Sequence, residues 1–393
     1  MYDLDVVIVG GGIGGLTSAI ALRRAGHRVR VFDQVRELRP VGAGISLWSN
    51  GVKVLNELGL GGPLAAMGGI MDRMAYADST GEVLCDFSLS PLVESVGQRP
   101  YPVIRSDLQS LLLQAAGPEN LVLGARCVGV EDRVDGVEGV VVQFEDGTSV
   151  TADVVVAADG THSRLREHVV GRAVHREYAG YVNWNGLVGA DPALAKDGTW
   201  QMWVGQGKRV SVMPVGGDRL YFFFDVPLEP DQVEPREAAP DPREQLATHF
   251  AGWAPAVLQL IESLDPSATN RIPIHDHEPV DRMARGSVAL LGDSAHSTAP
   301  DLGQGGCQAM EDALVMTRFL TTTNLGVVDA LRRYSDERTE RTGEIMRRAR
   351  DRARLTHGHD PDATQAWYDQ LRTESGESVV AGISRSILAG PCS

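Results

Sequence analysis

A glycine-rich turn close to the N-terminus constrains the fold of this chain most strongly. The turn, residues 10–15, follows the apolar run Asp5 to Val9 and precedes a helical pattern from Leu16 to Ala25. A second apolar run, Val29 to Phe32, then ends at Asp33. Strand, glycine turn, helix and strand in this order predict a βαβ unit, which belongs to a parallel sheet with helices packed on it.

Each part of this unit suits a bound dinucleotide. Gly10 permits the tight turn, Gly12 lets the backbone approach a pyrophosphate, and Gly15 allows close contact between helix and strand. Free N–H groups at the start of the helix favour the phosphates, and Asp33 can accept the hydroxyls of a ribose. The unit therefore predicts a dinucleotide, but it does not distinguish FAD from NAD.

Two later segments of the chain help to decide between FAD and NAD. Asp159 and Gly160 end the apolar run that starts at Asp153. Asp293 ends a second apolar run and is followed by a loop of small residues, 303–306, which opens a helix at about Cys307. A carboxylate at a strand end can bind the hydroxyls of a ribityl chain, and a loop of small residues can lay backbone N–H groups against a ring or a phosphate.

These segments resemble the dinucleotide, DG and GD fingerprints of the FAD-dependent aromatic hydroxylases, the family of p-hydroxybenzoate hydroxylase. Arg105 resembles a fourth element, an arginine that contacts FAD. A single departure, Gly306-Cys307 where the family often has Asn, puts one cofactor contact in doubt. The resemblance implies that FAD is held by Gly10, Gly12, Gly14, Gly15, Asp33, Gly44, Arg105, Val128, Asp159, Gly160, Asp293, Gly303, Gln304, Gly305 and Gly306.

The chain lacks a second glycine fingerprint of the kind that a separate nicotinamide domain would need. This fits a hydroxylase in which NADH or NADPH visits only transiently as the reductant. The sequence does not decide between the two reductants, and the resemblance favours NADH.

The middle of the chain points to the substrate. From about Tyr178 to Val226 the residues alternate and are rich in aromatics, which predicts several antiparallel strands. The stretches 178–188, 207–215, 221–228 and 270–276 are similar to those of the urate-hydroxylating members of the family. The similarity implies hydroxylation of urate at carbon 5 to 5-hydroxyisourate with O2. The alternative is a family member that acts on a hydroxybenzoate or salicylate.

Three residues are candidates for work on the substrate. Urate is an anion, and a guanidinium at Arg209 presents a planar fork suited to the edge of an anionic purine. By resemblance Tyr221 approaches both flavin and substrate, and Asp301 could orient Arg209 or relay a proton. The alternatives remain open: Arg209 as a surface residue at a strand end, Tyr221 as a core residue, and Asp301 as a helix cap.

Several neighbours receive weaker assignments. Lys208 should point to the opposite face of its strand and be solvated. Phe222 and Phe224 are expected in the core, and His296 is expected to be structural. Which way Asn183, Trp184 and Asn185 point cannot be read from the sequence, and the pair His357 and His359 lacks the further ligands of a metal site.

Composition limits the partners. The formal charge is −15, from 37 basic and 52 acidic side chains, which disfavours nucleic acid and anionic membranes. The four cysteines are far apart, so we expect free thiols and no zinc site. No basic leader or apolar stretch of about 18 residues occurs, so the expected location is the cytoplasm. The oligomeric state is left open.

We therefore expect an α/β protein with three parts. Residues 1–72, 99–177 and 272–325 would form a discontinuous, Rossmann-like FAD-binding domain. Residues 73–98 and 178–271 would form an inserted substrate domain with a mostly antiparallel β-sheet. Residues 326–393 would form a C-terminal helical region, with a long helix from Val327 to Arg354 and with Trp367 and Tyr368 docked on the body.

Overall fold

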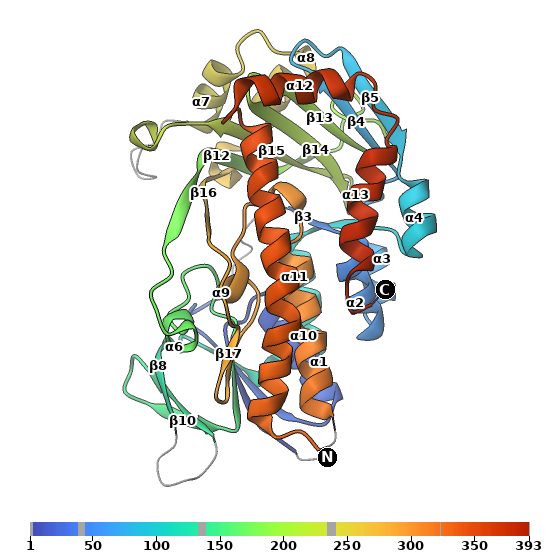
Figure 1. The fold of residues 1–393 in the computed structure, drawn as a ribbon. Helices are drawn as coiled ribbons and strands as arrows, with labels where there is room; N and C mark the ends of the chain where they lie inside the picture. The colour runs from blue at the N-terminus through green and yellow to red at the C-terminus, as the bar shows by residue number, and fades with distance from the viewer. Residues whose placement is uncertain (1–2, 38–43, 133–138, 234–240, 323, 393) are drawn as a thin grey trace.

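The computed structural model describes residues 3–37, 44–132, 139–233, 241–322 and 324–392. Within these ranges the chain forms two large sheets, two small ones and a set of helices around them (Figure 1). The predicted domain ranges run through the gaps, so the division into domains remains our proposal.

A six-stranded sheet carries the predicted βαβ unit. Its order is β17-β18-β11-β1-β2-β7, and all neighbours are parallel except β17 and β18. Residues 6–9 of β1 and all of β11 are buried Val, Ile and Ala residues, as a parallel sheet covered on both faces requires. Its strands are β1 (Asp5–Val9), β2 (Arg28–Asp33), β7 (Leu121–Leu123), β11 (Val154–Ala157), β17 (Ala284–Arg285) and β18 (Val288–Leu290).

The sheet brings the three fingerprint segments together. β1 lies between β2 and β11, and β18 lies next to β11, so the turns after β1, β11 and β18 meet at one edge. Segments nearly 300 residues apart in sequence therefore share one edge of one sheet, as the FAD-binding prediction required.

A seven-stranded sheet forms the second layer, in the upper part of Figure 1. Its order is β16-β12-β15-β14-β13-β4-β5, and only β13 and β4 are parallel. The predicted antiparallel character is confirmed. The strands are β4 (Arg73–Asp78), β5 (Val83–Ser88), β12 (Arg176–Gly189), β13 (Thr199–Gly205), β14 (Lys208–Val215), β15 (Arg219–Pro227) and β16 (Asn270–His277).

Two small sheets complete the strands. β3 (Gly44–Leu47) pairs with β6 (Tyr101–Ile104) in the region between the large sheets. A three-stranded sheet is formed by β8 (Cys127–Asp132), β9 (Val140–Phe144) and β10 (Ser149–Ala152).

Helices cover both large sheets. Near the N-terminal unit lie α1 (Ile13–Arg24), α2 (Ser49–Glu57), α3 (Gly61–Met67), α5 (Arg105–Ala116) and α6 (Arg166–Val170), whereas α4 (Ser90–Val96) packs against the C-terminal helix α13. The outer face of the seven-stranded sheet is covered by α7 (Pro242–His249) and α8 (Pro255–Ser263). The C-terminal part contains α9 (Asp293–His296), α10 (Gly305–Thr321), α11 (Val327–Thr356), α12 (Pro361–Leu371) and α13 (Glu377–Leu388).

The long helix α11 connects the two layers. It runs alongside α10 and reaches from the six-stranded sheet to the seven-stranded one (Figure 1). Its predicted extent is confirmed to within two residues at its C-terminal end. The docking of the tail is also confirmed: Trp367 is buried, and the Tyr368 hydroxyl accepts a hydrogen bond from the Gly207 N–H at 3.1 Å.

One boundary prediction was wrong. The helix expected from Leu16 begins at Ile13, so Gly14 and Gly15 belong to its first turn. A Cβ on Gly14 would lie 2.6 Å from the Leu291 side chain. Close packing of the helix therefore requires a glycine at position 14, and the close contact between helix and strand that was predicted for Gly15 is confirmed.

Candidate active site

A cavity of about 840 Å³ lies where the six-stranded sheet, the seven-stranded sheet and the C-terminal helices meet. Most of the site residues expected from the sequence line it, although they come from elements far apart in the chain. The lining members of that set are Gly12, Gly14, Gly15, Gly44, Arg105, Gly160, Arg209, Tyr221, Asp293, Asp301, Gly303, Gln304, Gly305 and Gly306.

Four expected cofactor residues do not line the cavity: Gly10, Asp33, Val128 and Asp159. Asp33 Oδ2 accepts a hydrogen bond from the Gly11 N–H at 2.7 Å, so it braces the glycine turn. Val128 is 40% exposed on β8. These residues lie around the strand ends, outside the enclosed part of the site.

The glycine turn has the shape that a pyrophosphate needs. Gly10 has φ +111°, and a Cβ there would lie 2.2 Å from the Ala158 carbonyl oxygen. A Cβ on Gly15 would lie 1.9 Å from the Gly10 carbonyl oxygen. At Gly12, by contrast, nothing lies within 4 Å of that position. Backbone packing thus requires two of the glycines, and the third faces open space at the start of α1, where an anion is favoured.

Other residues of the cavity fit the remainder of FAD. The indole Nε1 of Trp48 and the hydroxyl of Thr298 are buried and lack a hydrogen-bond partner among the described residues. Buried polar atoms normally have partners, so these two indicate groups that a ligand would satisfy. The Asp293 carboxylate is exposed and lines the cavity at the end of β18, where a ribityl chain would find an acceptor.

The inner face of the seven-stranded sheet forms the other wall. Side chains alternate across a strand, so one face of β12, β14 and β15 carries Asn183, Asn185, Arg209, Tyr221 and Phe223 into the cavity. The opposite face carries a core that includes Trp184, Phe222 and Phe224, all fully buried. The expectation that both phenylalanines lie in the core is confirmed.

Lys208 has the orientation that the alternation predicts, but its environment differs from the one expected. It points away from the cavity, as expected, but it is not simply solvated. Its Nζ donates to the His249 carbonyl oxygen at 2.6 Å, which ties β14 to the end of α7.

Arg209 is the centre of a buried polar group that we call the cavity cluster: Tyr181, Asn183, Arg209, Asp225, Asp301 and His357. The guanidinium donates from Nε to Asp225 Oδ2 at 2.8 Å and from Nη2 to Asp301 Oδ1 at 3.0 Å. Asp225 also accepts from Asn183 at 2.6 Å. Arg209 is thus held between two carboxylates, and its Nη1 has no hydrogen-bond partner in the described part of the chain.

Asp301 joins three elements. Its Oδ2 accepts from the Tyr181 hydroxyl at 2.6 Å, and its Oδ1 lies 3.4 Å from Nε2 of His357. His357 stacks on Tyr181 with ring centroids 3.8 Å apart. The alternative that Asp301 merely caps a turn is not what the structure shows, because its side chain accepts hydrogen bonds from Tyr181 and Arg209 and lies close to His357.

Burial and charge fix the ionisation of this cluster. Burial acts to raise the pKa of Asp301, but the Arg209 guanidinium and His357 outweigh it and hold the pKa well below its usual range. Burial acts to lower the pKa of Arg209, and Asp225 and Asp301 overcome this and raise it. The ion pair therefore persists throughout the ordinary working range of pH.

Tyr221 lies on β15, where the seven-stranded sheet approaches Gly44 of β3. A Cβ on Gly44 would come within 2.5 Å of the Tyr221 ring, so the glycine of β3 allows the two strands to approach. Burial and, next, the Asp225 carboxylate raise the pKa of the Tyr221 phenol. The hydroxyl is therefore protonated at neutral pH and available as a hydrogen-bond donor.

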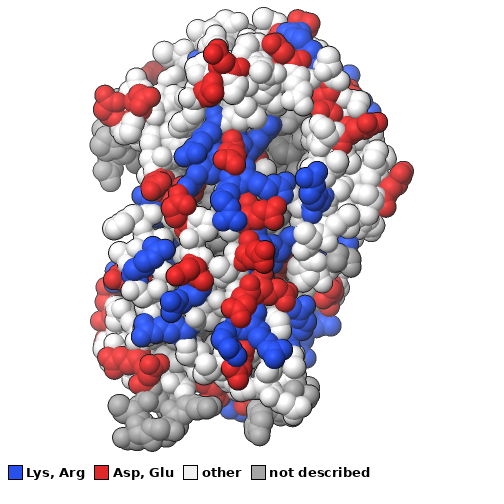
Figure 2. All heavy atoms as spheres, viewed as in Figure 1, with Lys and Arg blue, Asp and Glu red and all other residues white. Residues whose placement is uncertain are grey.

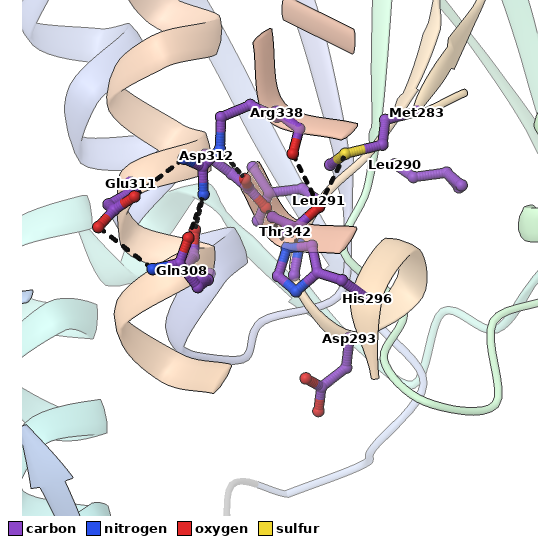
Figure 3. Close-up of polar contacts among 12 residues, drawn as sticks. Met283, Leu290, Leu291, Asp293, His296, Gln308, Glu311, Asp312, Arg338 and Thr342 are labelled. Atoms are coloured by element: carbon purple, nitrogen blue, oxygen red, sulfur yellow. Dashed lines mark hydrogen bonds and ion pairs between the residues drawn. The ribbon is translucent and has the colours of Figure 1, made fainter. Parts of the chain in front are cut away.

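A second buried polar group, which we call the interior cluster, consists of Asn50, His296, Gln308, Glu311, Asp312, Arg338 and Arg341. Figure 3 shows five of its members: His296, Gln308, Glu311, Asp312 and Arg338. Arg338 donates to Asp312 at 2.6 Å and to Glu311 at 2.8 Å. His296 Nε2 lies 2.7 Å from Asp312. His296 is thus a buried structural residue, which is the role favoured from the sequence.

The interior cluster reaches the cavity through Gln304 and Gly292. Gln304 lines the cavity, and its Oε1 accepts from Asn50 at 3.0 Å and from Gln308 at 3.1 Å. Asp312 also accepts from the Gly292 N–H at 2.9 Å. The cluster therefore fixes both ends of the loop that carries Asp293.

Sequence reasoning missed several cavity residues. Asp225 was not considered, although an aspartate within an apolar aromatic strand at an even spacing from Tyr221 signals a buried charge. Tyr181 shares the face of Asn183 by the same spacing. His357 was weighed only as a metal ligand, and nothing local to it indicates a contact with Asp301, 56 positions earlier.

The described residues show no other functional centre. They contain no group of three or more His, Cys, Asp or Glu side chains placed to hold a metal ion. None of their helices combines the length and the apolar character needed to span a membrane. The four cysteines are free, as expected.

Comparisons with known proteins agree with this geometry. The family described as FAD binding domain matches residues 3–349. A protein of Klebsiella pneumoniae subsp. pneumoniae named FAD-dependent urate hydroxylase is 48% identical over 99% of this chain and 100% of its own length. One of the same name from Mycolicibacterium vanbaalenii is 50% identical over 99% of this chain and 98% of its own.

A solved structure gives the same result. The crystal structure of Klebsiella pneumoniae HpxO complexed with FAD and uric acid has a TM-score of 0.94 and 47% identity, and it covers 99% of this chain and 97% of its own. The expected α/β fold is therefore confirmed. The chain belongs to the family of FAD-binding monooxygenases that includes the FAD-dependent urate hydroxylases.

Proposed function

We propose that this protein hydroxylates urate at carbon 5, with FAD as cofactor, NADH or NADPH as reductant and O2 as the oxygen source. The observation that carries the proposal is Arg209: a buried guanidinium between two carboxylates that still leaves Nη1 available at the cavity wall. Full-length relatives at 48% and 50% identity carry the urate name. The hydroxybenzoate or salicylate alternative is not favoured.

FAD would be held by the glycine turn at its pyrophosphate, by Asp293 at its ribityl chain and by residues 303–306 near its ring. When bound and reduced, FAD supplies the chemistry that activates O2. The residues of the chain itself bind the substrate, align it and keep water away from it.

The cavity cluster suits the recognition of a planar heterocycle with alternating N–H and C=O groups. Arg209 Nη1 would donate to a carbonyl oxygen of urate, and the Tyr221 hydroxyl would donate to a second carbonyl or to the flavin edge. Asp301 remains ionised and acts on the substrate only through Arg209, which it orients. Alignment of this kind can contribute several kcal/mol to a reaction by restricting the approach of the reacting atoms, up to roughly 7–11 kcal/mol in the most favourable cases.

The test is a substrate screen with the purified FAD-loaded enzyme. Urate should stimulate NADH oxidation, and NADH, O2 and hydroxylated product should be consumed and formed in equal amounts, with 5-hydroxyisourate identified by mass spectrometry. Salicylate and 4-hydroxybenzoate serve as the comparison substrates. Stimulation by either of these with product, and none by urate, would overturn the proposal.

A further inference from the structure

Arg352 on α11 is one of the five arginines that line the cavity, and its charge environment differs from that of Arg209. Arg209 lies within 3.0 Å of two carboxylates that are completely buried. The formal charges of Arg209, Asp225 and Asp301 sum to −1, and the Arg352 guanidinium, which interacts with this group at longer range, brings the sum to zero. Arg209 can therefore orient a bound ring, but it brings no surplus positive charge to an anion.

Arg352 has no carboxylate in direct contact, and Asp301, which raises its pKa, acts on it only from a longer distance. Its guanidinium lies over the Trp367 ring, 4.3 Å from the centroid, in a cation–π contact. Tyr76, the other close polar neighbour, contributes a hydrogen bond and is neutral, because burial raises the pKa of its phenol. Among the described residues no carboxylate lies within 4.0 Å of Arg352.

The geometry of α11 turns Arg348 and Arg352 towards the cavity, and of the two only Arg348 has a carboxylate within 4.0 Å among the described residues. Arg348, Arg352 and Leu355 follow the i, i+4, i+7 spacing of one helix face, and all three line the cavity. Arg348 lies near Glu344, at 3.7 Å, and donates to the Gly382 carbonyl oxygen at 3.4 Å. Arg350, on another face, is paired with Asp276 at 2.9 Å.

The exposed side chains along α11 carry charges of both signs (Figure 2). On the face shown in Figure 2, basic side chains along the region of α11 alternate with acidic ones, so their charges largely cancel. Burial lowers the pKa of Arg352, with Tyr76 opposing it, but a guanidinium starts so high that it stays protonated at neutral pH.

We propose that Arg352 is a specificity-determining residue that supplies the positive charge for an anionic ring substrate, whereas Arg209 aligns that ring. This inference deepens the proposed function and rests on it. It assigns two separate tasks to two arginines: the first selects anionic over neutral rings, and the second sets the geometry of the reaction.

The test compares Arg352→Gln, Arg352→Lys and a matched control, Arg347→Gln, in the FAD-loaded enzyme. Arg347 is exposed on the same helix and does not line the cavity. Urate binding is followed by its effect on the flavin absorbance, and coupling by the ratio of product to NADH. Arg352→Gln should raise the Kd and KM for urate at least tenfold, with coupling at saturating urate unchanged. Arg352→Lys should recover most of the affinity, and Arg347→Gln should match wild type.

Chloride provides an independent readout. A site with a guanidinium that has no carboxylate in direct contact should bind it, so chloride should inhibit the wild type competitively with urate, and Arg352→Gln should lose this inhibition. An Arg352→Gln enzyme that retains FAD and binds urate within twofold of wild type overturns the inference alone. Should that variant fail to fold, the wild type decides, because absent or non-competitive inhibition by chloride also overturns it. A wild type that binds no urate overturns the proposed function as well.

Discussion

The interior cluster and the cavity cluster use the same kinds of side chain, but their charges face different surroundings. In the interior cluster Arg338 and Arg341 balance Glu311 and Asp312, and both carboxylates are completely buried. In the cavity cluster one guanidinium faces two carboxylates, and part of it remains available at the cavity wall. A balanced group holds a structure in place, whereas an unbalanced one at a cavity can respond to a ligand.

The two clusters therefore have different roles in this fold. The interior cluster joins α10, α11 and the loop that starts at Gly292, so it sets the position of the cofactor-facing backbone. The cavity cluster joins the sheet to the loop at Asp301 and to the end of α11 at His357. Four predictions separate these roles, and they are given from the largest expected effect to the smallest.

Replacing Arg338 by Met should cause the largest loss of stability. The change leaves Glu311 and Asp312 buried without their shared partner, and breaking a buried ion pair in this way costs about 3–5 kcal/mol. Urea unfolding measures the change in the free energy of unfolding. Arg347→Gln, on the exposed face of the same helix, is the control and should change it by less than about 0.5 kcal/mol. Equal stability of the two variants would refute the structural role of the interior cluster.

Replacing Arg209 by Gln should affect function more selectively. Loss of the guanidinium should weaken urate binding by about 2–5 kcal/mol, and the misaligned substrate should leave NADH oxidation producing hydrogen peroxide in place of product. FAD content should remain normal, because no expected cofactor contact is touched. Lys208→Gln is the control, since Lys208 points to the other face of β14. Normal urate affinity and coupling in Arg209→Gln would place the substrate elsewhere.

Replacing Asp33 by Ala tests a charged residue outside both clusters. The carboxylate braces the Gly11 N–H and is expected to bind a ribose, so FAD retention should weaken by about 1.5–3 kcal/mol. Equilibrium dialysis of the apoprotein with FAD gives the Kd. The urate KM of the variant saturated with FAD should be that of wild type, and a changed KM would show that the dinucleotide end and the substrate end are not independent.

The pH dependence of stability should show the smallest effect. Burial opposes ionisation of Asp312, but His296 and Arg338 outweigh it and lower its pKa to about 2. A carboxyl with a depressed folded pKa stabilises the protein above its unfolded pKa of about 4, and this contribution, about 2 kcal/mol, is lost as the pH falls towards 2. Unfolding of wild type and Asp312→Asn should therefore converge between these values. A constant difference would contradict the assigned ionisation.

The sequence by itself determined the local parts of this protein. The glycine turn, the buried strands and the long helix follow from periodicity and from residue types whose preferences act over a few neighbours. The family resemblance implied that the fingerprint segments share one FAD-binding domain, and strand alternation separated Lys208 from Arg209 and Phe222 from Tyr221. The start of α1 was placed three residues too late because Gly14 and Gly15 lie inside the helix, where glycine is a poor helix former.

Of the charge contacts at the cavity, the sequence analysis anticipated only that of Asp301 with Arg209, across 92 positions. Tertiary structure decided the others: Asp225 is the strand neighbour of Arg209, and His357 and Arg352 come from the far end of α11. No local pattern encodes these distances, because each depends on how two sheets and a helix pack against one another. The ionisation of the buried carboxyls also depends on the tertiary structure. The pKa of a carboxyl reflects its burial and the partners that packing places beside it, and the sequence specifies neither directly.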